Sequence, residues 1–310
     1  MSEQISVSAT QPASSSRSPL KIVGMVVLFL TCVALLTLLK LPEARITGFI
    51  QGMVQSGLDP YGIYLTDRGR ELSLIPAPLY RLEHPVLELP DQTRVEFDEL
   101  RVHPKLAGLL TGKAGFSAEL KQGASEILVN AAGKGDRVDA DIHLENADLG
   151  KLGIFAFAAG LRGTGYLTGD IKIEGSMIDL SSLNGSLELK LRKLRLEEQN
   201  FMGFQLPMIQ ISEGDLNVEI KSGKLILKNV QIGKGMDDLR IQVTGDLALN
   251  RYLNASTMNL RAVLGLSDKL RQSLSILESL MGSAKTPDGR YAYKLTGTLG
   301  APMSMPDPQK

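Results

Sequence analysis

The residues that could carry acid–base or metal chemistry are few in this sequence, and they are scattered. The chain has three histidines, His84, His103 and His143, and a single cysteine, Cys32. Histidines that bind a metal usually recur as H-x-x-x-H or H-E-x-x-H, because both side chains must reach one ion. None of the three stands in such a pattern. Beyond Cys32 the chain has no thiol, so we expect no disulfide, cysteine-based metal site or cysteine nucleophile.

A group of carboxylates is the nearest approach to a calcium or acid–base site. It consists of Asp136, Asp139, Asp141 and Glu145. Three of these alternate with apolar residues along RVDADIHLE, residues 137–145. Alternation of this kind is typical of a β-strand with one solvated face. We therefore interpret the carboxylates as the wet side of a sheet rather than as a site.

Sequence motifs for nucleotide binding or acyl transfer are also missing from the chain. Residues 160–165, GLRGTG, are rich in glycine but lead into a strand-like run, whereas phosphate binding needs the N-terminus of a helix. The formal net charge is +0, and a nucleic-acid partner usually requires a basic excess. The sequence predicts a protein without enzymatic activity, cofactor, metal or nucleic-acid partner.

One apolar stretch near the N-terminus has the properties of a membrane anchor. Ile22–Leu39 contains no charged residue, and as a helix at about 1.5 Å per residue it would be about 27 Å long. A cleaved signal peptide has a shorter apolar region and a small-residue cleavage site, which Lys40–Arg45 does not supply. A buried helix of a soluble core is the other alternative. We predict a single transmembrane helix over residues 22–39.

The residues on either side of this stretch predict its orientation. Residues 1–21 are rich in serine and contain Arg17 and Lys21, so we expect a disordered cytoplasmic tail. Lys40 on the other side opposes this assignment. The bulk of the chain is therefore predicted to lie in the periplasm, with the anchor in the inner membrane, or to be extracytoplasmic in another type of cell. Residues 40–60 are predicted to form an amphipathic junction helix that packs on the sheet or lies on the membrane surface.

From residue 61 to residue 310 apolar residues recur at every second position, as in a β-strand, and no longer at the spacing of a helix. The longest alternating run is Asp238–Asn250, and Lys221–Lys224 and Asp288-Gly289 have the composition of tight turns. Within Leu183–Leu196 the leucines move from odd-numbered to even-numbered positions around Arg192-Lys193, which we call a change of parity. A bulge or a strand break there would keep the leucines on one face. The fold class predicted is mainly β: a long, curved antiparallel sheet, or half-pipe, with one or two amphipathic helices.

A second change of parity separates Val95 and Phe97 from Leu100 and Val102, and bulges at such points would bend the sheet. The helices are predicted at Ser267–Gly282 and at Pro104–Leu110, and residues 150–163 are expected to form a buried helix or a lipid-contacting loop. The residues expected to line an apolar groove are Leu187, Leu189, Leu191, Leu239, Ile241, Val243, Leu247 and Leu249.

The order of these segments resembles a known family. The pattern FxxLxVxPxLxxLLxGK at Phe97–Lys113 and the ending LTGxLGxP at Leu295–Pro302 carry most of the resemblance, together with GYLTGDIKIEGS at 165–176. They resemble the type II secretion system protein N (GspN) family, in its deltaproteobacterial and spirochaete form. That family in turn resembles the AsmA-like group, which has one N-terminal span and a periplasmic β-groove.

The resemblance implies a structural component of the type II secretion system, which moves folded proteins across the outer membrane. The AsmA-like relation implies instead a lipid-binding or lipid-transfer protein that uses an apolar groove between the two membranes. The expected partners are membrane lipids and other type II secretion components. The two expectations differ in what the apolar face of the sheet contacts.

Overall fold

The computed structural model describes residues 55, 59, 62–73, 79–90, 92–105, 112–176, 178–201, 204–274 and 281–308. The predicted tail and transmembrane segment, residues 1–39, lie outside this part, as does nearly all of the predicted junction helix at 40–60. No helix among the described residues is long and apolar enough to cross a membrane.

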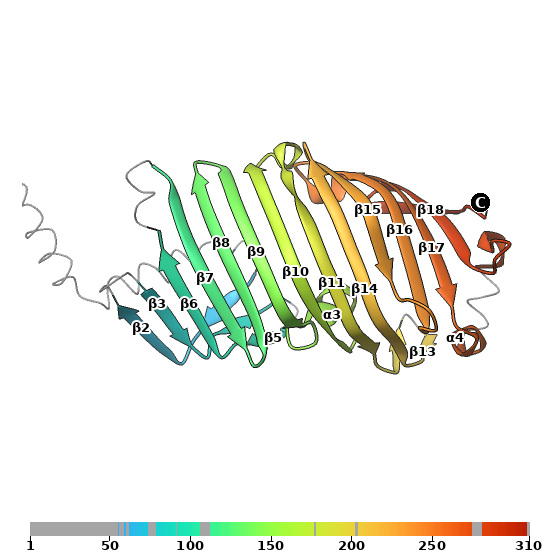
Figure 1. The fold of residues 1–310 in the computed structure, drawn as a ribbon, viewed down its shortest axis with the longest axis horizontal. Helices are drawn as coiled ribbons and strands as arrows, with labels where there is room; N and C mark the ends of the chain where they lie inside the picture. Colours follow the sequence, from blue (N-terminus) through green and yellow to red (C-terminus); the bar gives the residue numbers. More distant parts are fainter. Residues whose placement is uncertain are drawn as a thin grey trace, which may run out of the picture. The chain divides into compact units, whose positions relative to one another are not determined.

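The described chain is built on one 14-stranded antiparallel sheet, in which most strands pair with their neighbours in sequence (Figure 1). The prediction of a mainly β protein with a long antiparallel sheet is confirmed. In spatial order the strands are β2 (Gly69–Ser73), β3 (Leu79–Glu83), β6 (Glu99–Pro104), β7 (Ala114–Gln122), β8 (Ser125–Lys134), β9 (Arg137–Asp148), β10 (Gly163–Ser176), β11 (Asn184–Leu196), β14 (Ile209–Lys221), β15 (Lys224–Ile232), β16 (Leu239–Ala248), β17 (Thr257–Leu266), β18 (Tyr291–Thr298) and β19 (Ala301–Pro306).

The predicted tight turn between β14 and β15 is present. Lys221 pairs with Lys224, and the two residues between them have positive φ, 47° at Ser222 and 71° at Gly223. A two-residue hairpin with positive φ at both positions is a type I′ turn, whose twist matches that of the strands. Gly289, with φ 79°, likewise lies in a turn just before β18, as predicted.

The change of parity in β11 is a bulge, as one of the two alternatives held. Lys193 has φ 51°, and the register between β10 and β11 shifts between Thr164 and Tyr166. The extra residue keeps Leu191 and Leu194 on the same side of the sheet. The second parity change is different in kind, because the chain leaves β5 (Arg94–Glu96) and enters β6. It is a strand break, and the expected bulge at this point was wrong.

Several small elements accompany the sheet. They are a three-stranded sheet of β1 (Tyr64–Thr66), β4 (Val86–Glu88) and β5, a hairpin of β12 (Gln199–Phe201) and β13 (Phe204–Leu206), the helices α3 (Ile154–Ala159) and α4 (Asp268–Ser273), and the single turns η3 (Leu180–Ser182), η4 (Leu253–Ala255) and η5 (Gly282–Ala284).

The predicted helices are found only in part. Residues 150–163 contain α3, so a helix is present as one alternative held, but it is not the buried helix expected, because Ile154 is 44% exposed. Ser267 caps α4, since its side chain accepts a hydrogen bond from the backbone N–H of Leu270. Residues 275–280 of the predicted Ser267–Gly282 helix lie outside the described residues. So do residues 106–110 of the predicted Pro104–Leu110 helix, and Pro104 itself ends β6.

Candidate functional site

A continuous row of side chains crosses all fourteen strands of the large sheet on one side. Each member of the row is the direct cross-strand partner of the next, so all of them point to the same face. Every member except Gly245 and Ser304 carries an apolar side chain. From edge to edge the row reads Leu72, Tyr80, Val102, Ala118, Val129, Ile142, Ile171, Leu187, Val218, Leu227, Gly245, Leu260, Leu295 and Ser304.

A parallel row on the same side has the same character. It reads Leu82, Leu100, Leu120, Ile127, Leu144, Gly169, Leu189, Leu216, Val230, Val243, Ala262, Tyr293 and Pro306. We call the side of the sheet that carries these two rows the apolar face. It contains no charged side chain in either row.

The opposite side of the sheet is polar and is held by cross-strand ion pairs. The guanidinium of Arg101 lies 2.8 Å from Glu99 and 3.7 Å from Glu119, and Glu99 also pairs with Arg81. Burial raises the pKa of Glu99, but its bonds to Arg101 and Arg81 outweigh this effect and leave the pKa below its usual value. Hydrogen bonding from Lys121 is the largest effect that lowers the pKa of Glu119. Neighbouring basic side chains therefore favour the ionised form of both carboxylates.

One end of the apolar face is covered by small elements. Leu270 of α4 and Ala284 of η5 lie in a buried cluster with Leu191 and Ile211 of the sheet, and they are 3% and 0% exposed. Phe155 of α3 packs against the same cluster. Figure 1 shows α3, β13 and α4 together along the lower edge of the sheet, where β10, β14 and β17 meet their loops. This row of elements forms the closed end of the face.

In the middle of the apolar face several side chains are only half-buried, although others in the two rows, such as Leu144 and Val218, are buried at 9% exposure. The half-buried side chains include Ile142, Ile171, Leu187, Leu227 and Leu260. A fully packed β-sandwich would bury such residues completely between two sheets. The middle of the apolar face therefore keeps apolar surface accessible along neighbouring strands, which is uncommon in a soluble domain without a partner for that surface.

Seven of the eight residues predicted to line a groove lie on the apolar face of β11 and β16, and the eighth, Leu249, lies outside the strands. Leu187, Leu189 and Leu191 lie on β11, and Leu189 and Leu191 are buried in core clusters, at 9% and 6% exposure. The β16 residues Leu239, Ile241, Val243 and Leu247 are half-buried on the same face. Leu249 lies just beyond β16, and its backbone N–H donates to the carbonyl of Gly223 at 2.7 Å.

The groove residues predicted from the sequence come only from β11 and from β16 with Leu249, and leave out the members of the apolar face on the other strands. Ile171, Val218, Leu227 and Leu260 join the predicted Leu187 in one row. The signal that could have found them is the alternation within each strand. Their alignment across strands, however, depends on bulges, which shift the register by a residue at places such as residues 228–229 of β15.

The polar residues singled out by type do not converge on a catalytic or metal site. His143 Nδ1 lies 2.8 Å from Asp170, its direct cross-strand partner, and both side chains are exposed. Asp139, Asp141 and Glu145 are exposed along β9. No group of histidine, cysteine or acidic residues that could hold a metal ion occurs within the described part of the chain.

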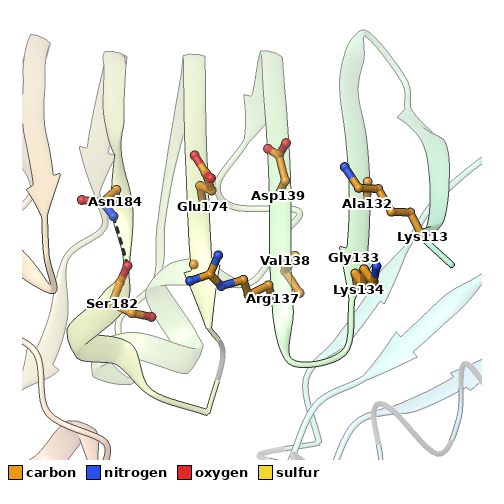
Figure 2. Close-up of a pocket in the computed structure, with 11 residues that line it drawn as sticks. Lys113, Ala132, Gly133, Lys134, Arg137, Val138, Asp139, Glu174, Ser182 and Asn184 are labelled. Atoms are coloured by element: carbon orange, nitrogen blue, oxygen red, sulfur yellow. Dashed lines mark hydrogen bonds between the residues drawn. The ribbon is translucent and has the colours of Figure 1, made fainter. Parts of the chain in front are cut away.

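A charged cavity of about 420 Å³ lies at the hairpin end of β8, β9 and β10. Figure 2 shows Asp139 and Glu174 side by side on neighbouring strands, and these two carboxylates are direct cross-strand partners. Lys113, Lys134 and Arg137 also line it. The mixture of both signs gives the cavity no preference for one kind of ion, and the apolar face remains the candidate functional site.

No protein-family model, curated protein or solved structure matches this chain.

Proposed function

We propose that the protein is a non-enzymatic component of the cell envelope that holds the acyl chains of membrane lipids on its apolar face. The row from Leu72 to Leu295 carries this proposal, because it is not interrupted by charge and its half-buried members, such as Ile171 and Leu227, keep apolar surface accessible. At about 4.8 Å per strand, fourteen strands extend such a row to roughly 60 Å. This is about twice the hydrocarbon thickness of a bilayer, so whole acyl chains fit along it.

The proposal includes a shape for the sheet and a place in the cell. It requires the sheet to curve as a half-pipe, with the apolar face on the inside, so that neighbouring strands shield a bound chain from water. The bulges at Lys193 and Asn146, with φ 51° and 49°, support it because bulges bend and twist a sheet. Anchoring by residues 22–39 in the inner membrane, with the sheet in the periplasm, is part of the same proposal.

The direct test is native mass spectrometry of the full-length protein released from its membrane. Co-purifying lipid is expected on the wild type. The double substitution Ile171→Asn and Leu227→Asn places polar groups in the middle of the row and should lower lipid occupancy about tenfold or more, because each costs the burial of a methyl-rich side chain. Both side chains are half-buried, so the fold should survive.

The chain supplies a matched control for this pair. Leu128 is also half-buried, but it lies on the opposite side of the sheet between its partners Glu119 and His143. Leu128→Asn should leave lipid occupancy unchanged. A wild-type protein that carries no lipid, or an equal loss in Leu128→Asn, would refute the proposal.

A second candidate function is a structural role in type II secretion. The motifs at Phe97–Lys113 and Leu295–Pro302, which resemble the GspN family, favour it. In this case deletion of the gene should abolish secretion of exoproteins and leave the outer-membrane barrier intact. The purified protein should bind secretin or pseudopilin subunits, and the Asn substitutions at Ile171 and Leu227 should not affect secretion. A leaky outer membrane with normal secretion would favour the lipid role instead.

A further inference from the structure

The hairpin turns at the other end of the strands, away from α3 and α4, form a connected edge. These turns follow one another along the sheet because alternate connections of an antiparallel meander lie at the same end. We call this edge the hairpin rim, and we define it by residues 134–137, 178–183, 221–224, 249–256 and 299–300.

Hydrogen bonds join each turn of the rim to the next. The side chain of Ser176 donates to Asp136 at 2.8 Å and accepts from the N–H of Ile178 at 3.1 Å. The N–H of Gly223 donates to the carbonyl of Leu183 at 2.7 Å, and its own carbonyl accepts from Leu249 at 2.7 Å.

The last two turns of the rim are joined in the same way. The N–H of Leu299 donates to the carbonyl of Ser256, and that of Gly300 to Asn254, both at 2.9 Å. These bonds use backbone groups that would otherwise need water. A turn whose polar backbone is satisfied internally loses less when it leaves water for an apolar medium.

Large apolar side chains project from the rim into solvent. Ile178 is 60% exposed, Tyr252 71%, Leu253 57% and Leu299 42%. They come from three different connections, yet the hydrogen bonds above place these connections in one series. Exposed apolar side chains gathered at turn tips are expected where a protein contacts a membrane or a partner. Tyrosine in particular prefers the boundary between water and lipid.

Basic side chains accompany these apolar tips. The rim has the exposed cations Lys134, Arg137, Lys221, Lys224 and Arg251. Its carboxylates are Asp136, which accepts a hydrogen bond from Ser176 at the end of β10, and Asp179, which accepts one from Ser181 in its own turn. Lys221 and Lys224 pair with carboxylates inside the strands, Glu219 at 2.8 Å and Asp246 at 3.1 Å. With Lys221 and Lys224 paired, the other three cations of the rim face two carboxylates, which leaves a small excess of positive charge at the tips.

We propose that the hairpin rim docks on the surface of a lipid bilayer that contains anionic lipids. Ile178, Tyr252, Leu253 and Leu299 enter the interface, and the basic residues contact lipid phosphates. The rim borders the apolar face, since Ile220 and Leu225 on that face lie in the strand ends just beneath the turn 221–224. Docking would bring the edge of the face against the lipid. The proposal is independent of whether the face itself holds acyl chains.

The test is flotation of the full-length protein, held in nanodiscs of phosphatidylcholine, with added vesicles of phosphatidylcholine with or without phosphatidylglycerol. The wild type should float with the vesicles that contain phosphatidylglycerol, and added salt should weaken the association. Tyr252→Ser with Leu253→Ser should reduce the floating fraction about tenfold, since two interfacial apolar side chains are lost. Lys134→Gln with Arg137→Gln should reduce it for anionic vesicles only.

Met236 provides the matched control. It is 100% exposed and lies in the loop between β15 and β16, at the opposite end of the strands. Met236→Ser should float like the wild type. Equal flotation of the Tyr252 and Leu253 variant, or equal loss in Met236→Ser, would overturn the proposal. The rim variant should keep its unfolding midpoint and its co-purifying lipid, so a failure of docking is distinguishable from a failure of acyl-chain binding.

Discussion

At the scale of single residues, the apolar face depends on glycines where neighbouring strands approach closely. Gly245 lies in the row that runs from Leu72 to Ser304 and has φ 121°, a conformation that residues with a Cβ rarely adopt. A Cβ added there would lie 2.2 Å from the carbonyl oxygen of Asn259 on β17. Both the backbone and the neighbouring strand therefore require glycine.

Substitution of Gly245 by alanine should lower the free energy of unfolding by about 1–3 kcal/mol, through strain in the backbone and displacement of β17. Chemical denaturation measures this loss. The control is Gly265→Ala on the next strand, where the nearest atoms belong to the flexible side chain of Arg240, at 3.1 Å. Similar losses in the two variants would contradict the account of Gly245.

The ion pairs of the polar side make a prediction about pH. The folded-state pKa of Glu99 is below its usual value, so its contribution to stability is complete above the unfolded pKa of about 4.5. This contribution is lost as pH falls through the lower, folded-state pKa. Glu99→Gln should therefore be less stable at neutral pH, and its stability should fall less steeply on acidification. Denaturation at a series of pH values measures both effects.

Glu145→Gln is the matched control for this experiment, since Glu145 is an exposed carboxylate on β9. It should follow the wild-type pH profile. If Glu99→Gln also follows that profile, then Glu99 does not bind its arginines strongly enough to matter in solution.

At the scale of elements, short helices and turns cover the apolar face at one end of the strands. The helices α3 and α4 have only 6 residues each, too few to be stable alone. They persist because the sheet offers them apolar partners, such as Leu191 and Ile211 for Leu270. The helices at this end of the strands therefore depend on packing against the sheet for their stability.

Leu270→Ala should cost about 2–5 kcal/mol, because a side chain only 3% exposed is lost from the cluster. Hydrogen exchange should accelerate first in α4 and at the end of β17. Leu253→Ala, at 57% exposure on the rim, should change stability little. Protection of α4 that survives Leu270→Ala would show that another contact holds the helix in place.

The elements also show how far sequence patterns reach. The alternation over Asp238–Asn250 predicted β16, and the leucine phase in Leu183–Leu196 predicted a bulge or a strand break at Arg192-Lys193, where the structure has a bulge. Local side-chain period and turn composition are sufficient for such features. The break between β5 and β6 was predicted as a bulge. Whether a change of parity is a bulge or a strand break depends here on which strand pairs with Glu99, and this pairing is a long-range property of the fold.

At the scale of the whole described chain, the sheet has two edges, β2 and β19. The edge strand β19 carries Pro302 and Pro306, which lack a backbone N–H and so limit the addition of a further strand. The sheet therefore has a natural stop at its C-terminal edge. The candidate functional site, the apolar face, also depends on the whole sheet. No single segment predicted it, because each strand contributes one or two residues whose alignment appears only when the register is known.

The most direct test of acyl-chain binding is photo-crosslinking of the full-length protein with a fatty acid that carries a diazirine in its chain. Mass spectrometry then locates the adducts. The account predicts adducts on the apolar face, at residues such as Ile171, Leu187 and Leu227, and their loss when excess phospholipid competes. No adduct, or adducts equally frequent around Leu128 on the polar side, would contradict it.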